Sequence, residues 1–336
     1  MTLAQPPAPP LRLPSRRTLS LGLLAATGFY IAFAAWTGGE TLRAALAAVS
    51  WHGPAAVVGA ASLNYLLRFL RWQYYLRLWG HRLPWRLHLL YYLAGFALTT
   101  TPGKAGETVR SLYLHRHGVR YSQSLGAFFV ERLLDVVALL FLASLAAGRV
   151  PGLELVPAAA AGLLLAVLVF LVSGRGLGWL QRRLRHGGPS RLRHLAAGAV
   201  ATLENAHRLL RPPTLALGLT LGLAAWTAQG LAFLYLLHLL GLDLDWSRGL
   251  GGYALGLLGG AASLIPGGIG ATEAVLSVLL LGFGAGKAVA LTAPLILRLG
   301  TLWYAVALGF VATAVLGLTG RGITLDGDQN DAVSRR

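Results

Sequence analysis

Two short stretches, Thr101–Glu107 (TPGKAGE) and Ile265–Glu273 (IPGGIGATE), decide how this chain is organised. Both contain Pro-Gly-x-x-Gly followed by a carboxylate, and both interrupt long apolar sequence. One stretch falls in each half of the chain. Because proline removes an amide donor and glycine weakens a helix, each stretch predicts a break between two helices.

The matching spacing continues beyond the two stretches. Arg132 follows Glu107 at the same separation in sequence at which Arg298 follows Glu273. Each of these arginines opens a further apolar run. Gly/Pro-broken segments at corresponding places in two halves of a membrane protein indicate a transporter binding site. The sequence therefore predicts an internal repeat whose two copies share one site.

The composition is that of a polytopic membrane protein. Apolar residues make up 55% of the chain and charged residues only 12%, and apolar runs approach the roughly 20 residues that a helical span needs. The net charge of +17 is explained by basic loops on one side of the membrane, so we predict no nucleic-acid partner. The chain has no cysteine, which excludes disulfides and thiol chemistry.

The apolar runs predict six full spans, at residues 19–37, 53–70, 121–147, 155–172, 214–240 and 288–317. Two shorter apolar segments, 88–100 and 249–264, cannot cross, and each leads into one of the Pro-Gly breaks. We therefore predict one re-entrant hairpin from the cytoplasm and one from outside. The stretch 68–86 is basic and rich in aromatic residues, which is typical of a cytoplasmic interface.

The basic residues orient this arrangement. The predicted inner regions hold 22 lysines and arginines, whereas the outer loops hold four: Arg43, Arg149, Arg248 and Lys287. This asymmetry predicts that both termini are cytoplasmic. The fold class is then an all-α polytopic membrane protein of the inner (plasma) membrane, with about six full spans and two opposed re-entrant helical hairpins. The hairpins belong to inverted repeats at about 53–147 and 214–317.

The rest of the chain is predicted to flank one transmembrane domain at 19–318. Residues 1–18 are proline-rich and predicted to be a disordered cytoplasmic tail, and 319–336 form a second cytoplasmic tail. Residues 173–213 hold eight arginines and are predicted to be a cytoplasmic linker. Apolar residues at helical spacing in 191–210 indicate an amphipathic helix that lies on the membrane surface or docks a partner.

Ionisable residues inside the membrane are the candidate site, because they are costly there. The predicted phosphate-binding cations are Lys104, Arg110, Arg132 and Arg298. The predicted carboxylates that tune the site are Glu107, Glu131, Asp135 and Glu273. The predicted hairpin tips, where free amides meet a ligand, are Pro102, Gly103, Gly106, Pro266, Gly267, Gly268 and Gly270.

Simpler interpretations compete with this one. Glu107 with Arg110, and Arg132 with Asp135, are i,i+3 pairs that neutralise each other. The glycines are also common in membrane helices for packing alone. His115-x-His117 is more typical of a polar flank than of a metal site, so no metal is predicted. The spacing indicates no catalytic set and no cofactor.

These residues also carry a family resemblance. The stretch Pro102–Glu107 with Arg110, then Glu131, Arg132 and Asp135, then Pro266–Glu273, resembles the lysylphosphatidylglycerol synthase transmembrane-region (flippase-like) family over roughly residues 18–320. The resemblance implies a role in moving lipids between leaflets. In multidomain members this region accompanies a soluble domain that aminoacylates phosphatidylglycerol. The sequence reaches Arg336 shortly after the last predicted span, so we expect a stand-alone member without that transferase domain.

The expected function is therefore that of a lipid flippase, not an enzyme. Its substrate would be an aminoacyl- or glycosyl-phospholipid or a polyprenyl-phosphate carrier. The alternatives are a membrane-embedded transferase that acts on a lipid-linked donor, and a non-transporting subunit that docks a lipid-modifying partner enzyme. The predicted partners are membrane lipids and, in the last case, that enzyme.

Overall fold

The computed structural model describes residues 50–100, 107–146, 162, 169 and 191–320. Within these ranges the chain is helical and contains no strand, which confirms the all-helical prediction. The predicted span at 19–37, most of the one at 155–172, the tail 1–18, residues 321–336 and the tip residues 101–106 lie outside the described residues. Lys104, Pro102, Gly103 and Gly106 are among them.

The first half of the described chain runs from α3 to α9. Its elements are α3 (His52–Leu78), α4 (Trp85–Ala94), the 3-10 turn η1 (Gly95–Leu98), α5 (Arg110–His115), α6 (Tyr121–Ser144) and α9 (Arg191–Leu209). The second half comprises α10 (Pro212–Leu239), α11 (Trp246–Ala262), the turn η3 (Pro266–Gly268), α12 (Ala271–Gly282), α13 (Lys287–Arg298), the π-helical turn η4 (Leu299–Trp303) and α14 (Tyr304–Leu318).

Two of these helices are long and apolar enough to cross a bilayer, among the residues described. They are α10 and the continuous helix Lys287–Leu318, which agree with the spans predicted at 214–240 and 288–317. The long helix contains Pro294, and the π-helical turn η4 follows one turn later. Both α3 and α6 are also long, at 27 and 24 residues, but they carry buried charges.

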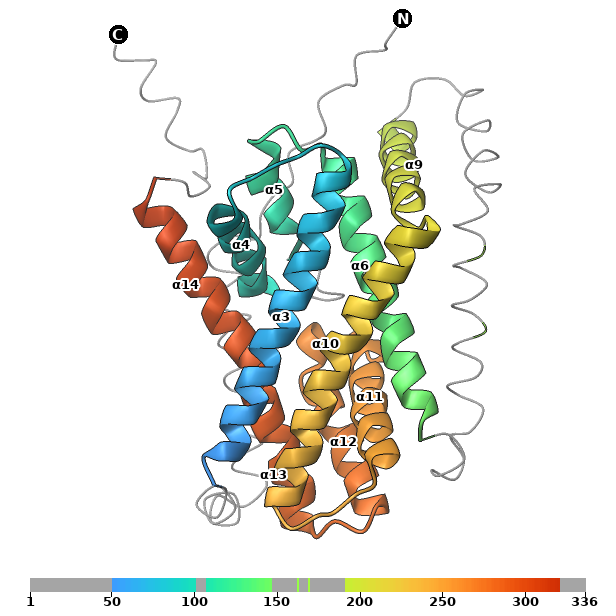
Figure 1. Cartoon of the computed structure of the whole chain (residues 1–336), viewed down its shortest axis with the longest axis vertical. Helices are drawn as coiled ribbons and strands as arrows, with labels where there is room; N and C mark the ends of the chain where they lie inside the picture. The colour runs from blue at the N-terminus through green and yellow to red at the C-terminus, as the bar shows by residue number, and fades with distance from the viewer. Residues whose placement is uncertain (1–49, 101–106, 147–161, 163–168, 170–190, 321–336) are drawn as a thin grey trace, which may run out of the picture.

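The helices are arranged so that the two short helix pairs lie at opposite ends of the molecule (Figure 1). The pair α4 and α5 lies in the upper half of the view, and the pair α11 and α12 lies in the lower half. Long helices connect the two levels: α3 packs on α10, and α6 packs on α9, α10 and α11. The inverted repeat and the re-entrant hairpins themselves stay predictions.

The end of α3 corrects one prediction. The helix continues past the predicted end at residue 70 to Leu78, so Arg68 and Arg71 are not part of a solvent-facing basic stretch. Their side chains are 3% and 0% exposed. The pattern of basic and aromatic residues predicted a solvent-facing environment for these two arginines. That prediction was wrong because the pattern does not reveal the carboxylates elsewhere in the chain with which they pair. Trp72 and Tyr75 are likewise buried in the core beside them.

The amphipathic helix predicted at 191–210 is confirmed as a helix, α9. It lies along α6, with Val200, Ala206 and Leu209 buried. A glycine at position 126 of α6 permits the close approach, because a Cβ there would meet the backbone oxygen of Thr202 at 2.9 Å. Part of the apolar face of α9 is therefore covered by this chain itself.

Candidate functional site

A group of buried ionic residues, here called the ion cluster, lies between α3, α5 and α6. Its centre is Glu131, which is fully buried. Oε1 of Glu131 accepts hydrogen bonds from Arg68 (3.0 Å) and Arg132 (2.9 Å), and Oε2 accepts one from Arg110 (2.6 Å). The hydroxyl of Tyr92 also donates to Oε1, at 2.8 Å. Several donors thus compensate the charge that burial would otherwise penalise.

Asp135 is the second anion of the ion cluster, one turn further along α6. Arg71 Nη2 donates to its Oδ1 at 2.6 Å, and Arg132 Nη2 lies 3.1 Å from its Oδ2. The predicted i,i+3 contact of Arg132 with Asp135 is therefore present. Arg71 also donates to the carbonyl of Gly218 in α10. A Cβ at Gly222 would lie 2.8 Å from Arg71 Nη1, so glycine there makes room for the guanidinium.

Arg110 is held as a caged cation. Its guanidinium carbon lies 3.7 Å from the ring centre of Trp72, 4.9 Å from that of Tyr92 and 5.4 Å from that of Phe128. Cation–π contacts of this kind gain strength when the cation is desolvated, and Arg110 is 1% exposed. Its partner carboxylate is Glu131, so the predicted neutralisation by Glu107 is not what fixes it.

The equal spacing seen in the sequence becomes a pair of equivalent contacts. In the first half, Glu107 Oε2 lies 3.9 Å from Arg132 Nη2. In the second half, Glu273 Oε1 lies 3.3 Å from Arg298 Nε. Glu107 also accepts a hydrogen bond from the hydroxyl of Thr99 at 2.8 Å. Both carboxylates are 1% exposed.

The turn between α11 and α12, which is the predicted second tip, is built by glycines with left-handed backbone geometry. Gly267 and Gly270 have φ values of +65° and +82°, which other residues adopt only with strain. The carbonyl of Gly267 accepts a hydrogen bond from Arg298, and the amide of Gly270 donates to Glu273 at 3.0 Å. These glycines therefore serve the turn, and packing alone does not account for them.

The two halves meet at this tip. A Cβ built on Gly267 would lie 3.4 Å from the Cα of Thr100, the last described residue before the first Pro-Gly stretch. The end of η1 and the turn η3 are therefore neighbours in the middle of the molecule, although they are far apart in sequence.

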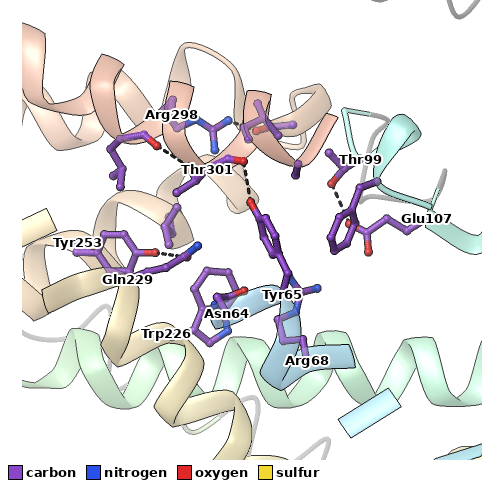
Figure 2. A pocket seen from close by; sticks show the side chains of 16 residues that line it. Asn64, Tyr65, Arg68, Thr99, Glu107, Trp226, Gln229, Tyr253, Arg298 and Thr301 are labelled. Carbon is purple, nitrogen blue, oxygen red and sulfur yellow. Dashed lines mark hydrogen bonds between the residues drawn. The ribbon is translucent and has the colours of Figure 1, made fainter. Parts of the chain in front are cut away.

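A cavity of about 80 Å³, here called the central cavity, lies at this meeting point. Figure 2 shows side chains from both halves pointing into it. The first half contributes α3 and the segment around Thr99 and Glu107, and the second half contributes α10, α11, η3 and the helix that carries Arg298. The wall residues that carry polar atoms in their side chains are Asn64, Tyr65, Arg68, Thr99, Glu107, Trp226, Gln229, Tyr253, Arg298 and Thr301.

Hydrogen bonds fix several of these wall residues. Tyr65 donates to the carbonyl of Thr301 at 2.7 Å, and Tyr253 donates to Gln229 Oε1 at 2.8 Å, as Figure 2 shows. The first bond connects α3 with η4, and the second connects α10 with α11. These bonds fix the positions of Tyr65 and Gln229 on the wall.

The structure distributes the predicted site residues over two neighbouring places. Glu107, Gly267 and Arg298 line the central cavity. Glu131, Asp135, Arg110 and Arg132 belong to the ion cluster instead, and Arg132 connects the two places through its contact with Glu107. Glu273 does not line the cavity but contacts Arg298, which does.

Sequence reasoning missed Arg68, Asn64 and Trp226, all of which line the central cavity. The available signal was weak: Asn64, Arg68 and Arg71 are spaced at i, i+4 and i+7, which places them on one face of a helix. That face is otherwise apolar. Trp226 carries no sequence signal, because a tryptophan within an apolar span is ordinary.

Comparison with protein families identifies the chain. The model of the lysylphosphatidylglycerol synthase TM region matches residues 19–309. The chain belongs to this family. The ion cluster and the central cavity are thus features of a lysylphosphatidylglycerol synthase TM region, which confirms the resemblance seen in the sequence and places the chain among membrane proteins named for a lipid-related activity. No curated protein matches the chain.

Proposed function

We propose that this protein translocates an anionic or headgroup-modified lipid between the leaflets of the membrane, without chemical change to the lipid. The observation that carries the proposal is the central cavity, which is lined by apolar, polar and charged side chains from both halves of the chain. Ionisable residues such as Glu107 and Arg298 are costly inside a membrane and are therefore expected to have a use there. Membrane lipids are the proposed partners.

The arrangement of the halves supports an inverted repeat. The α4–α5 and α11–α12 pairs lie at opposite ends of the molecule (Figure 1), and the tips that follow α4 and α11 approach each other at Thr100 and Gly267. The carboxylate–arginine contacts Glu107–Arg132 and Glu273–Arg298 occupy equivalent places. In transporters with inverted repeats, one half rocks against the other about a site at the repeat interface.

The chemistry of the tips suits a lipid headgroup. Glu273 keeps Arg298 in place beside the cavity, and Arg298 in turn holds the carbonyl of Gly267. A headgroup phosphate that enters the cavity would compete with Glu273 for Arg298. We propose that this exchange of partners couples the presence of the lipid to the position of the second tip, and that Lys104 supports it from the first.

The test is leaflet exchange of labelled lipid in proteoliposomes. Glu273→Ala and Lys104→Ala should each abolish exchange while the protein still inserts into the membrane. Lys287→Ala is the matched control, because Lys287 is exposed at the far end of α13. Wild-type exchange rates in both Glu273→Ala and Lys104→Ala would show that the site is misplaced.

The same assay separates the rival functions. Chemical conversion of the lipid would identify a membrane-embedded transferase. If the wild-type protein gave neither exchange nor conversion, a subunit that docks a lipid-modifying enzyme would be favoured over transport.

A further inference from the structure

Two buried polar side chains on the wall of the central cavity have no hydrogen-bond partner among the described residues. Asn64 of α3 is 0% exposed, and neither its amide nitrogen nor its amide oxygen is bonded within that part of the chain. Trp226 in α10 is 8% exposed, and its indole N–H also has no hydrogen-bond partner among the described residues. Buried polar groups are nearly always paired, so each exception requires an explanation. Both residues line the same cavity (Figure 2), so both can donate a hydrogen bond to a polar ligand that enters it.

The charges around the cavity indicate that this ligand is an anion. The ion cluster and the two tips together hold five arginines and four carboxylates within the described residues, a net charge of +1. Two of the arginines, Arg68 and Arg298, line the cavity itself. The Nε of Arg68 makes no hydrogen bond within the described chain and lies 3.5 Å from Oδ2 of Asp135. An anion in the cavity would balance the excess charge.

One carboxylate on the wall sets the side of the cavity on which an anion can lie. Glu107 accepts a hydrogen bond from Thr99 and lies 3.9 Å from Arg132. Its remaining charge disfavours an anion beside it. The favourable position is therefore the wall formed by α3 and α10, where Asn64 and Trp226 are found.

The cavity is large enough for a phosphate group. One water-sized sphere needs roughly 10–15 Å³, so a cavity of about 80 Å³ has room for a phosphorus atom and its oxygens. The cavity is not closed on all sides, so its volume sets no upper limit on the group that follows the phosphate.

From these observations we infer that Asn64 and Trp226 bind the phosphate of an anionic lipid in the central cavity. The amide nitrogen of Asn64 and the indole N–H of Trp226 donate to the phosphate oxygens, and Arg68 and Arg298 balance its charge. This inference rests on the proposed function, because it specifies which residues would bind the lipid that is moved through the same site.

The test is calorimetric binding of water-soluble short-chain phosphatidic acid to the full-length protein in detergent. Asn64→Leu and Trp226→Phe should each weaken binding about tenfold, the loss expected for one hydrogen bond to a charged group. Gln73→Leu in α3 and Ser277→Ala in α12 are matched controls, because they also remove buried polar atoms that lack a partner among the described residues but do not line the cavity. Both controls should bind as the wild type does.

Two comparisons make the result decisive. Short-chain diacylglycerol, which lacks the phosphate, should bind at least tenfold more weakly than phosphatidic acid, and equal affinity would overturn the assignment to the phosphate. Inorganic phosphate that bound as tightly as phosphatidic acid would overturn the assignment to a lipid. Equal affinities in Asn64→Leu, Trp226→Phe and their controls would overturn the site itself. If binding follows the expected pattern but liposomes show no leaflet exchange, the transport function fails and the phosphate site stands.

Discussion

Glu131 combines complete burial with the largest number of charged partners in the ion cluster. Three guanidinium groups and one phenol donate to its two oxygens. Such a group stabilises the fold only as a complete set, since removing one partner leaves the other charges buried and uncompensated. The ion cluster therefore fixes the relative positions of α3, α5 and α6 before any lipid is bound.

We expect Glu131→Gln to lower the free energy of unfolding by about 3–5 kcal/mol, the cost of breaking a buried ion pair from one side. Unfolding in detergent, followed by circular dichroism, measures this change. Asp243→Asn is the control, because the side chain of Asp243 is 81% exposed, and exposed pairs contribute about 1 kcal/mol or less. Equal losses in the two variants would contradict a structural role for the cluster.

The sequence predicted Glu131 and Asp135 as buried carboxylates but not their partners in α3. Arg68 and Arg71 are 63 and 64 residues away from the carboxylates to which they donate, and the residues around them form a typical basic and aromatic interface pattern. A local sequence pattern reports only the residues that are adjacent along the chain. The environment of a buried arginine also depends on residues that are far away in sequence. The equal spacing of Glu107 with Arg132 and of Glu273 with Arg298 is visible in the sequence, and both pairs are in contact in the structure.

At the scale of elements, the contact of α11 with α12 depends on glycine. A Cβ at Gly256 would lie 2.4 Å from the side chain of Leu276, and one at Gly260 would lie 1.9 Å from the hydroxyl oxygen of Thr272. The two helices therefore approach more closely than larger residues allow. This close packing places the turn η3 against the central cavity.

We expect Gly260→Ala to destabilise the protein by about 1–3 kcal/mol, because the added methyl group overpacks the contact with Thr272. Gly59→Ala in α3 is the control, since no described atom lies within 4 Å of a Cβ built at that position; it should leave stability unchanged or raise it by up to about 1 kcal/mol through helix propensity. Thermal unfolding in detergent distinguishes the two. A stable Gly260→Ala variant would show that the contact is looser than described.

The sequence predicted helix boundaries correctly where an apolar run contained few charged residues. The predicted span at 214–240 is α10, and that at 288–317 is the helix Lys287–Leu318. The sequence placed the end of α3 too early, because charged residues inside a helix give the same sequence pattern as charged residues that follow its end. The π-helical turn η4, which packs against α3, had no sequence signal.

At the scale of the whole molecule, the connections at the two ends should lie on opposite sides of the membrane. The segment between α3 and α4 lies at the top of Figure 1, and the segment between α10 and α11 lies at the bottom. Removing Arg68, Arg71 and Arg110 from the 22 predicted inner basic residues leaves 19 against four outside. The positive-inside rule still places the α3–α4 connection in the cytoplasm.

We therefore expect a membrane-impermeant maleimide to label Asp243→Cys in intact cells, and Arg82→Cys only after permeabilisation. Both positions are exposed, and the natural chain has no cysteine to interfere. Labelling of both cysteines in intact cells, or the reverse pattern, would contradict the orientation with cytoplasmic termini.

The ion cluster also has a consequence for synthesis. Arg68 and Arg71 leave the ribosome well before Glu131 and Asp135, their partners in α6. On an inserting helix, each guanidinium near the bilayer centre costs about 2.5–3.5 kcal/mol. We therefore expect α3 to become stably inserted in the membrane only after α6 has been translated, when Glu131 and Asp135 can pair with Arg68 and Arg71. The two helices would then complete their insertion together.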